Sequence, residues 1–223
     1  MHPITHTIRE MYAIFHDLGF QIAQGPELEE EFYNFDALNI PNDHPSRDMQ
    51  DTFWIKGQKG KLLTTQTSAI QIRFMQNNKP PFRILAPGKV FRNEATDATH
   101  EAQFFQMEGM IVDKEVSLAD LKGVLEYAFK KLFGDNAEIR FRPSYFPFVE
   151  PGVEVDVKWK GKWLEVLGAG LIHPHVLKAG NIDGKEWQGL AFAFGLDRIA
   201  MLKYGIDDIR HLYSGDLRFI NQF

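Results

Sequence analysis

The chain contains no cysteine, so disulfide bonds and thiolate metal sites are excluded among its 223 residues. No apolar run approaches the roughly 18–20 residues that a membrane-spanning helix requires. The first residues, Met-His-Pro-Ile-Thr-His, lack the basic-then-apolar pattern of a secretory signal. We therefore expect no association with a membrane, and the expected location is the cytoplasm.

Positive charge is not in excess either. The chain has 25 Lys and Arg against 30 Asp and Glu, a formal net charge of −5. Proteins that hold nucleic acid by its phosphates usually present a basic face, because each neutralised phosphate releases counterions. If this chain acts on RNA, we expect much of the binding to come from another chain or domain, or from a local patch.

The sequence also lacks repeats, low-complexity tracts and long Gly/Ser/Pro linkers. Hydrophobic residues make up 44% of the chain, which is enough to bury one sizeable core. The simplest prediction is one continuous domain over residues 1–223.

Two amphipathic helices are predicted from apolar residues that recur at helical spacing. The first begins at Pro3 and runs to Leu18, where Gly19 can stop it. The second starts at Ser117, with Asp120 placed for a capping box. The apolar stripes comprise Ile4, Ile8, Met11, Phe15 and Leu18 in the first helix, and Leu118, Leu121, Leu125, Phe129 and Leu132 in the second, which Gly134 ends.

Strand patterns dominate the rest of the chain. Residues 83–93 and 104–112 flank a polar loop at 94–103. A turn at 160–161 joins an alternating segment, 153–159, to a second strand at 163–171. Residues 189–194 form a buried strand that runs into a helix from 195 to about 204. Mostly strands with a few packed helices predict an α+β fold with an antiparallel sheet.

Two segments carry residues suited to a nucleotide. Arg92 ends one strand and Phe104 starts the returning strand, so a guanidinium can bind a phosphate while an aromatic face stacks on a base. In Ala-Phe-Ala-Phe-Gly-Leu-Asp-Arg, residues 191–198, small residues alternate with large ones and Arg198 can meet a second phosphate. The alternative for the first segment is that Arg92 forms a salt bridge and Phe104 is a core residue. The alternative for the second segment is a structural ion pair between Asp197 and Arg198.

These segments resemble the signature motifs of class II aminoacyl-tRNA synthetases: motif 1 at about 2–28, motif 2 at about 83–113 and motif 3 at about 189–204. The resemblance implies the class II catalytic fold, a mixed, mainly antiparallel sheet flanked by helices. The narrower resemblance, over essentially the whole chain, is to bacterial phenylalanyl-tRNA synthetase α subunits. It is carried by residues 35–39, 44–45, 51–54, 65–68, 104–109, 140–148, 163–165 and 216–219.

The resemblance implies an ATP site. Arg92 is similar to the family's α-phosphate ligand and Arg198 to its γ-phosphate ligand, and these two residues are the expected catalytic groups. Phe104 resembles the ring that stacks on adenine. His100 resembles a loop residue that helps to hold the phosphates, and Glu94 is expected at the same site.

A phenylalanine site is implied next to it. Its residues are Trp54, Ser68, Gln106 and Glu108 for the α-amino end, Phe146 and Phe148 as rings that sandwich the phenyl group, and Ala191 at the floor. An α-ammonium needs a carboxylate and neutral acceptors, and an aromatic ring packs well against other rings. The alternatives are a solvated face for Gln106 and Glu108, and a proline-locked loop with core aromatics at 142–148.

The implied reaction is ATP-dependent formation of phenylalanyl-adenylate, followed by acyl transfer to tRNA(Phe). Mg²⁺ is the implied cofactor, with Glu165 as a candidate ligand. The implied partner is a β subunit in a heterotetramer, with a homodimer as the alternative. His173 and His175 invite a second metal site, but two His without a third placed ligand favour a turn.

The sequence departs from the family at motif 3, where Ala193 replaces a usual Gly and Asp197 an often-found Glu. The family's N-terminal coiled-coil arm, which contacts tRNA, has no counterpart before Pro3, so aminoacylation is a weaker expectation than adenylate formation. Two other functions stay open: a paralogue that activates an amino acid without charging tRNA, and a non-catalytic scaffold subunit. Intact Arg92, Phe104, Glu108 and Arg198 argue against the scaffold.

Overall fold

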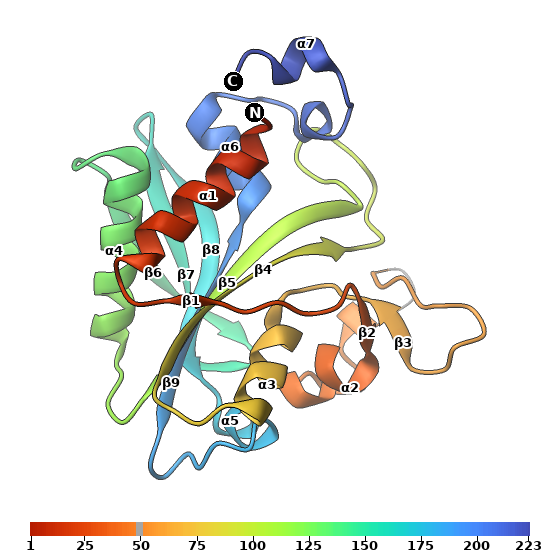
Figure 1. Cartoon of the computed structure of the whole chain (residues 1–223), viewed down its shortest axis with the longest axis vertical. Coiled ribbons are helices and arrows are strands. Elements are labelled where there is room, and N and C mark those ends of the chain that lie inside the picture. The colour runs from red at the N-terminus through yellow and green to blue at the C-terminus, as the bar shows by residue number, and fades with distance from the viewer. Residues whose placement is uncertain (48–50) are drawn as a thin grey trace.

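A computed structural model describes residues 1–47 and 51–223. Its centre is a seven-stranded sheet in the order β1-β4-β5-β9-β8-β7-β6, in which β1 pairs with β4 in parallel and every other pair is antiparallel (Figure 1). A small second sheet joins β2 to β3. The elements are α1 (Pro3–His16), β1 (Gln21–Ile22), β2 (Leu28–Glu30), α2 (Glu31–Asn34), η1 (Asp36–Leu38), η2 (Pro45–Arg47), β3 (Lys61–Leu63), α3 (Ser68–Asn77), β4 (Phe82–Phe91), β5 (Gln103–Asp113), α4 (Leu118–Phe133), β6 (Ile139–Phe146), β7 (Val149–Trp159), β8 (Lys162–Ile172), α5 (Pro174–Ala179), β9 (Gln188–Gly195), α6 (Leu196–Tyr204), η3 (Ile209–Leu212) and α7 (Leu217–Ile220).

The predicted α+β class, with a mainly antiparallel sheet flanked by helices, is confirmed. Both long amphipathic helices are present. The first, α1, ends at His16 rather than Leu18, and Gly19 lies in the following turn with φ +80°. The second, α4, begins as expected. Ser117 accepts a hydrogen bond from the backbone N–H of Asp120, while the Asp120 side chain accepts from the N–H of Ser117.

The five predicted strands are also present, with ends shifted by at most four residues. The turn between β7 and β8 has positive φ at both Lys160 and Gly161, as a tight hairpin between twisted strands requires. Strand β9 runs directly into α6 at Leu196. The motif 3 segment is therefore a strand that ends at the first turn of a helix.

Several short elements were not predicted, and two of the unpredicted elements, α3 and β6, border the cavity described below. Helix α3 buries residues on several sides, including Ser68, Ala69 and Gln71, so it shows no single apolar stripe. Strand β6 is an edge strand without buried residues, and its proline and polar side chains resemble those of a loop. Strands were expected to dominate between the two long helices, and α3 is a ten-residue helix within that region.

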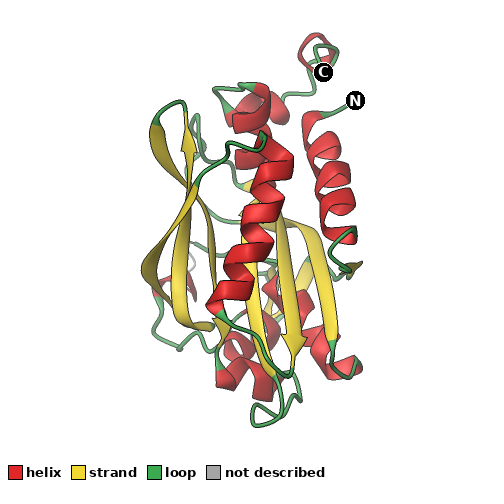
Figure 2. Cartoon of the chain, turned by 90° about the vertical axis from the view of Figure 1, so that its left-hand side faces the viewer, coloured by secondary structure: helices red, strands yellow, loops and turns green. Residues whose placement is uncertain are grey.

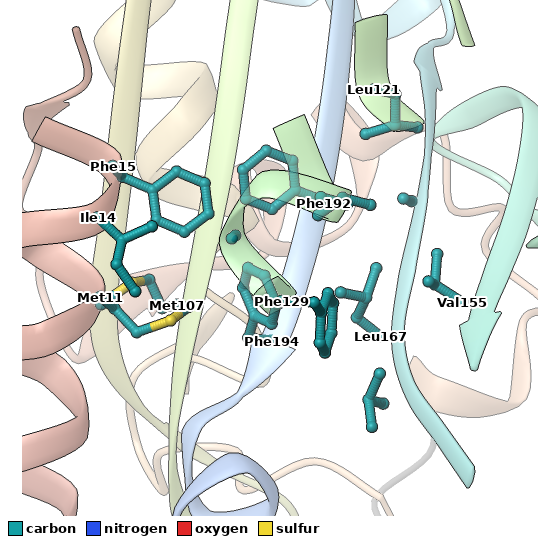
Figure 3. Packing of buried hydrophobic residues seen from close by; sticks show 14 of the residues in the cluster. Met11, Ile14, Phe15, Met107, Leu121, Phe129, Val155, Leu167, Phe192 and Phe194 are labelled. Atoms are coloured by element: carbon teal, nitrogen blue, oxygen red, sulfur yellow. The ribbon is translucent and has the colours of Figure 1, made fainter. Parts of the chain in front are cut away.

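The sheet separates two layers. Helices α1 and α4 cover one face, where they pack on alternate residues of β5 and β9 (Figures 1 and 2). Phe192 and Phe194 of β9 meet Phe15 of α1 and Phe129 of α4 in this core (Figure 3). The intervening residues of the same strands face the other way. We therefore expect the ligand-binding site on the face of the sheet that α1 and α4 do not cover.

The two chain ends meet beside α6 (Figure 1). The Met1 ammonium donates to the backbone oxygen of Phe223 at 3.4 Å, and the His2 ring contacts the carbonyl of Leu212 at 2.8 Å. A small apolar cluster lies there, formed by Ile4, Ile206, Ile209 and Leu212. In the described part of the chain, no helix combines the length and apolar character needed to cross a membrane.

Candidate active site

A cavity of about 690 Å³ opens largely on the sheet face opposite α1 and α4. Side chains from β5, β8, β9, the start of α3, the loop after β4 and the turn between β6 and β7 line it. Every predicted site residue except Trp54 contributes to its wall: Ser68, Arg92, Glu94, His100, Phe104, Gln106, Glu108, Phe146, Phe148, Glu165, Ala191 and Arg198. Motifs 2 and 3 and the intervening aromatic segment thus converge on one space.

The floor of the cavity is built from small residues. Glu108 of β5 pairs with Ala193 of β9, which in turn pairs with Gly168 of β8. Beside them, Ala191 pairs with Gly170. A Cβ added at Gly168 would lie 3.0 Å from the ring of Phe146, so the missing side chain allows that ring to lie over the sheet. Small and large residues alternate in β9, so the alanines face the cavity and the phenylalanines face the core.

Glu108 is a buried carboxyl group of the site, with 3% of its surface exposed. Its carboxylate accepts hydrogen bonds from the Ser68 hydroxyl at 2.8 Å and from the Gln71 amide at 2.5 Å. Burial raises the pKa of Glu108 to about 7, and these hydrogen bonds and the positive charge of Arg92 oppose that rise. Among the described residues no salt bridge to Glu108 is present, and such a buried carboxylate is suited to receive a cation from a ligand.

Gln106 lies two residues before Glu108 on the same side of β5, and both line the cavity. Its side-chain oxygen accepts a hydrogen bond from the backbone N–H of Thr67 at 3.3 Å. The solvated-face alternative is therefore wrong for Glu108, which is buried, and Gln106 is partly buried.

Sequence reasoning missed two polar residues of this region. Gln71 holds one oxygen of Glu108, and Gln66 lines the cavity. Gln71 follows Ser68 by three residues, so the two side chains share a face once a helix is assigned there. A prediction of helix α3 would have placed Gln71 beside Ser68 and so identified it as a site residue.

Arg92 and Phe104 form the pair that the sequence predicted. The guanidinium carbon of Arg92 lies 5.1 Å from the centre of the Phe104 ring, and its Nε donates to the carbonyl of Thr65 at 3.2 Å. Burial lowers the pKa of Arg92, while the negative charge of Glu94 opposes this most strongly. An arginine is charged throughout the physiological range, so the site presents a largely buried cation beside an aromatic face.

Arg198, in the first turn of α6, is exposed toward the cavity. Within residues 1–47 and 51–223 it has no ion-pair partner. The expected alternative, a structural ion pair with Asp197, is therefore wrong. Asp197 is instead buried and accepts hydrogen bonds from the backbone N–H of Phe105 at 2.7 Å and from the Tyr213 hydroxyl at 2.5 Å.

The loop between β4 and β5 carries His100. Asp97 organises it by accepting hydrogen bonds from the backbone N–H groups of Thr99, at 2.7 Å, and His100, at 2.8 Å. The His100 ring contacts the Asp97 carboxylate at 3.0 Å, and the contacts with Thr99 and His100 lower the pKa of Asp97. All three side chains are exposed, and those of Thr99 and His100 line the cavity.

Phe146 and Phe148 form one aromatic wall. Their ring centres are 5.8 Å apart and their planes differ by 20°. A third ring between them would need about 7 Å, twice the about 3.5 Å contact distance of carbon atoms. In this arrangement the two rings do not form the expected sandwich, and a ligand ring would meet them from one side.

Trp54 is the one predicted residue outside the cavity. It forms a bridge with Leu62 and its ring lies 6.2 Å from that of Phe35. It packs against the second hydrophobic cluster, beside the small sheet of β2 and β3. In this structure Trp54 contributes to packing, and its role in binding stays a prediction.

Glu165 lines the cavity with its side chain 59% exposed, 3.5 Å from the guanidinium of Arg142. Across the described ranges, no group of three His, Asp or Glu could hold a metal ion. Glu165 alone therefore suits only a metal that takes most of its ligands from water and substrate oxygens. The expected turn at His173 and His175 is instead the start of helix α5, which His173 caps, and the described residues include no group of metal ligands there.

The whole chain, residues 1–223, matches the family described as the class II core domain of tRNA synthetases (F). The chain belongs to the class II tRNA synthetases. It is 50% identical over 236 aligned positions to the phenylalanine–tRNA ligase alpha subunits of Bacillus cytotoxicus, Bacillus cereus and Bacillus anthracis, which covers 100% of this chain and 68% of each relative. Among solved structures, pyrrolysyl-tRNA synthetase from Desulfitobacterium hafniense has a TM-score of 0.76 and 18% identity, covering 96% of this chain and 74% of that one. At that identity the likeness supports the class II synthetase fold alone.

Proposed function

We propose that this cavity activates L-phenylalanine with ATP, forming phenylalanyl-adenylate and pyrophosphate, and that the acyl group then passes to the terminal ribose of tRNA(Phe). One observation carries the proposal. A single cavity combines a buried carboxylate, Glu108, an aromatic wall, Phe146 and Phe148, and two guanidinium groups, Arg92 and Arg198. An amino acid with an aromatic side chain and a nucleoside triphosphate together need this set of partners.

The amino acid is proposed to lie between Glu108 and the aromatic wall. Its α-ammonium would pair with Glu108, whose raised pKa would fall when that positive charge arrives. Gln106 and Ser68 offer neutral acceptors nearby. The phenyl ring would contact Phe146 and Phe148 from one side, above the small floor residue Ala191.

ATP is proposed to lie over Phe104, with Arg92 at the α-phosphate, His100 near the phosphates and Arg198 at the γ-phosphate. Glu94 would remain beside Arg92 at the rim. In this arrangement a carboxylate oxygen of phenylalanine attacks the α-phosphorus, a new P–O bond forms, and the bond to the pyrophosphate oxygen breaks. Arg92 and Arg198 stabilise the charge that develops on the oxygens, so the protein acts by positioning and electrostatics.

Mg²⁺ fits the site only in part. Magnesium commonly binds one or two carboxylates together with water and substrate phosphates, and Glu165 can supply one such carboxylate. When bound, the ion would neutralise phosphate charge. Arg142, 3.5 Å from Glu165, would have to release that carboxylate.

A β subunit is the proposed partner, because the relatives at 50% identity are named alpha subunits. The net charge of −5 supports the same proposal, since a chain with little positive charge is poorly suited to hold tRNA alone. Heterotetramer and homodimer are both compatible with these observations.

ATP–pyrophosphate exchange tests the function. Exchange that requires phenylalanine supports the proposal, and exchange with another amino acid in its place supports a non-charging paralogue. No exchange, even with a β subunit supplied, would favour a scaffold role. Charging of tRNA(Phe) by the α–β mixture, against no charging by either chain alone, would establish the partner.

A further inference from the structure

We propose that the segment from Gly205 to Tyr213 is part of the nucleotide site, and that Tyr213 and Asp197 are positioning residues for Arg198 and Phe104. This inference rests on the proposed function, because it takes Arg198 and Phe104 to contact ATP. Neither Tyr213 nor Asp197 is expected to touch the nucleotide directly. Their role is to fix the elements that do.

Asp197 joins the two halves of the proposed ATP site. One carboxylate oxygen accepts from the backbone N–H of Phe105, directly after the ring of Phe104, at 2.7 Å. The other accepts from the Tyr213 hydroxyl at 2.5 Å. Because Asp197 directly precedes Arg198 in α6, this carboxylate links the start of β5 to the first turn of the helix that carries Arg198.

The same segment also contacts the loop that carries His100. The backbone N–H of Ile209 donates to the carbonyl of Ala98 at 2.9 Å, and Ile209 itself lines the cavity. The hydrogen bond from Arg210 to Asp208 and the negative charge of Asp208 raise the pKa of Arg210 most, and the negative charges of Asp97 and Glu101, in that loop, raise it further. The segment thus touches the loop, β5 and α6, the three parts that bring Arg92, Phe104, His100 and Arg198 together.

Apolar contacts hold this segment in place. Gly205, with φ +67°, ends α6 and lets the chain turn back. Ile206, Ile209 and Leu212 are then buried against Ile4 of α1. Because these contacts fix the segment, the Tyr213 hydroxyl is held at hydrogen-bond distance from Asp197, which a frayed segment could not ensure.

The energetic argument concerns a buried carboxylate. Asp197 is 2% exposed, and burial raises its pKa. Removing the Tyr213 hydroxyl would take a 2.5 Å donor away from one carboxylate oxygen of Asp197, and a buried acceptor that loses a donor is costly. A shift of the first turn of α6 toward another donor would relieve this cost, and that shift would displace Arg198.

The test compares ATP binding and phenylalanine binding by the full chain, measured by calorimetry. Tyr213→Phe removes only the hydroxyl, and we expect the Kd for ATP to rise about tenfold while the Kd for phenylalanine stays within about twofold. Tyr127→Phe, the same deletion on α4, is the matched control and should leave both constants unchanged. Asp197→Asn keeps an oxygen for Phe105 and can offer its amide to the Tyr213 oxygen, so it should bind ATP far better than Asp197→Ala.

Several outcomes decide the matter. Unchanged ATP binding by Tyr213→Phe would overturn the inference, and so would an equal loss of ATP and phenylalanine binding with a lowered Tm. If the unaltered chain binds ATP but shows no phenylalanine-dependent exchange, the proposed function fails, and a selective loss of ATP binding in Tyr213→Phe would still support the inference. If the unaltered chain binds no ATP, the inference is overturned as well.

Discussion

The carboxylate of Glu108 accepts a 2.8 Å hydrogen bond from the hydroxyl of Ser68, a residue 40 positions earlier in the chain. Ser68 is the first residue of α3, and Gln71, one turn later, holds the other carboxylate oxygen. The partial positive charge at the start of a helix also favours a nearby anion. Glu108 is therefore kept in a defined position, and the positive charge of Arg92 opposes the rise of its pKa.

Replacing Glu108 with glutamine should weaken phenylalanine binding. The variant keeps the shape and an oxygen for Ser68 but loses the charge that pairs with an ammonium. Hydrogen bonds to charged groups contribute about 1.5–3 kcal/mol, so we expect the KM for phenylalanine in pyrophosphate exchange to rise about 10- to 150-fold. The KM for ATP should change little. Glu126→Gln, on the exposed side of α4, is the control, and a normal phenylalanine KM in Glu108→Gln would contradict the assignment.

The same group predicts a pH dependence of stability. The pKa of Glu108 is about 7 in the folded chain and near its ordinary 4.5 when unfolded, so the folded state binds more protons between these values. The contribution of Glu108 to the free energy of unfolding should therefore fall as the pH rises from about 4.5 to about 7, by at most about 3 kcal/mol. Chemical denaturation at pH 5, 6, 7 and 8 checks this. Glu108→Gln should be more stable than the unaltered chain at pH 8 and lose the part of the slope due to Glu108.

Phenylalanine binding should show the opposite trend. The ammonium needs the ionised form of Glu108, so affinity should increase from pH 6 to pH 8 as the carboxylate loses its proton. Calorimetric titration at each pH measures it. An affinity that is flat over this range, or that falls, would show that Glu108 is not the group that meets the ammonium.

Arg198 gives a prediction about ATP alone. It is exposed to the cavity and has no ion-pair partner in the described residues, so its guanidinium is available for a phosphate. Lysine keeps the charge but loses the planar two-pronged contact, and Arg198→Lys should lower kcat/KM for ATP about 10- to 100-fold. Arg218→Lys is a suitable control, because that side chain is 91% exposed and paired with Asp216. Equal effects of the two substitutions would exclude a specific role for Arg198.

Much of this arrangement could be predicted because strand periodicity is strict. Residues two apart face the same way, so Gln106 and Glu108 had to share a side, as did Ala191 and Ala193. The capping box of Ser117 and Asp120 likewise follows from local hydrogen bonding. Where local geometry or local hydrogen bonding decides how a side chain is placed, its position can be predicted from the sequence alone.

The misses have a different physical origin. The role of Gln71 depends on a short helix whose buried residues include polar side chains that meet Glu108, a contact between distant segments. Trp54 was placed by resemblance alone; its ring packs near that of Phe35, outside the cavity lining, and its binding role stays a prediction. The Asp197–Tyr213 hydrogen bond joins residues in different elements, and neither residue shows this partner in its local pattern. Tertiary contacts, rather than propensities, decide these positions.

Gly109 is required for packing of the core rather than for chemistry in the cavity. It lies one residue after Glu108 in β5 but faces the core, where an added Cβ would be 2.0 Å from the Phe192 ring. Phe192 is itself held by Phe15 and Phe194, with ring centres 5.4 and 5.6 Å away, so it has little freedom to move. Overpacking of this kind typically costs about 1–3 kcal/mol, and this contact is closer than real Cβ atoms show.

Gly109→Ala should therefore lower the free energy of unfolding by about 3 kcal/mol or more, measured by urea denaturation. Gly123→Ala is the matched control, because Gly123 lies within α4 with open space around its Cβ position. That substitution should stabilise the chain by about 0.5–1 kcal/mol, as alanine is favoured over glycine inside helices. Equal stability of the two variants would mean that Phe192 can leave its place beside β5, and the close approach of strand and ring would then not be required for the fold.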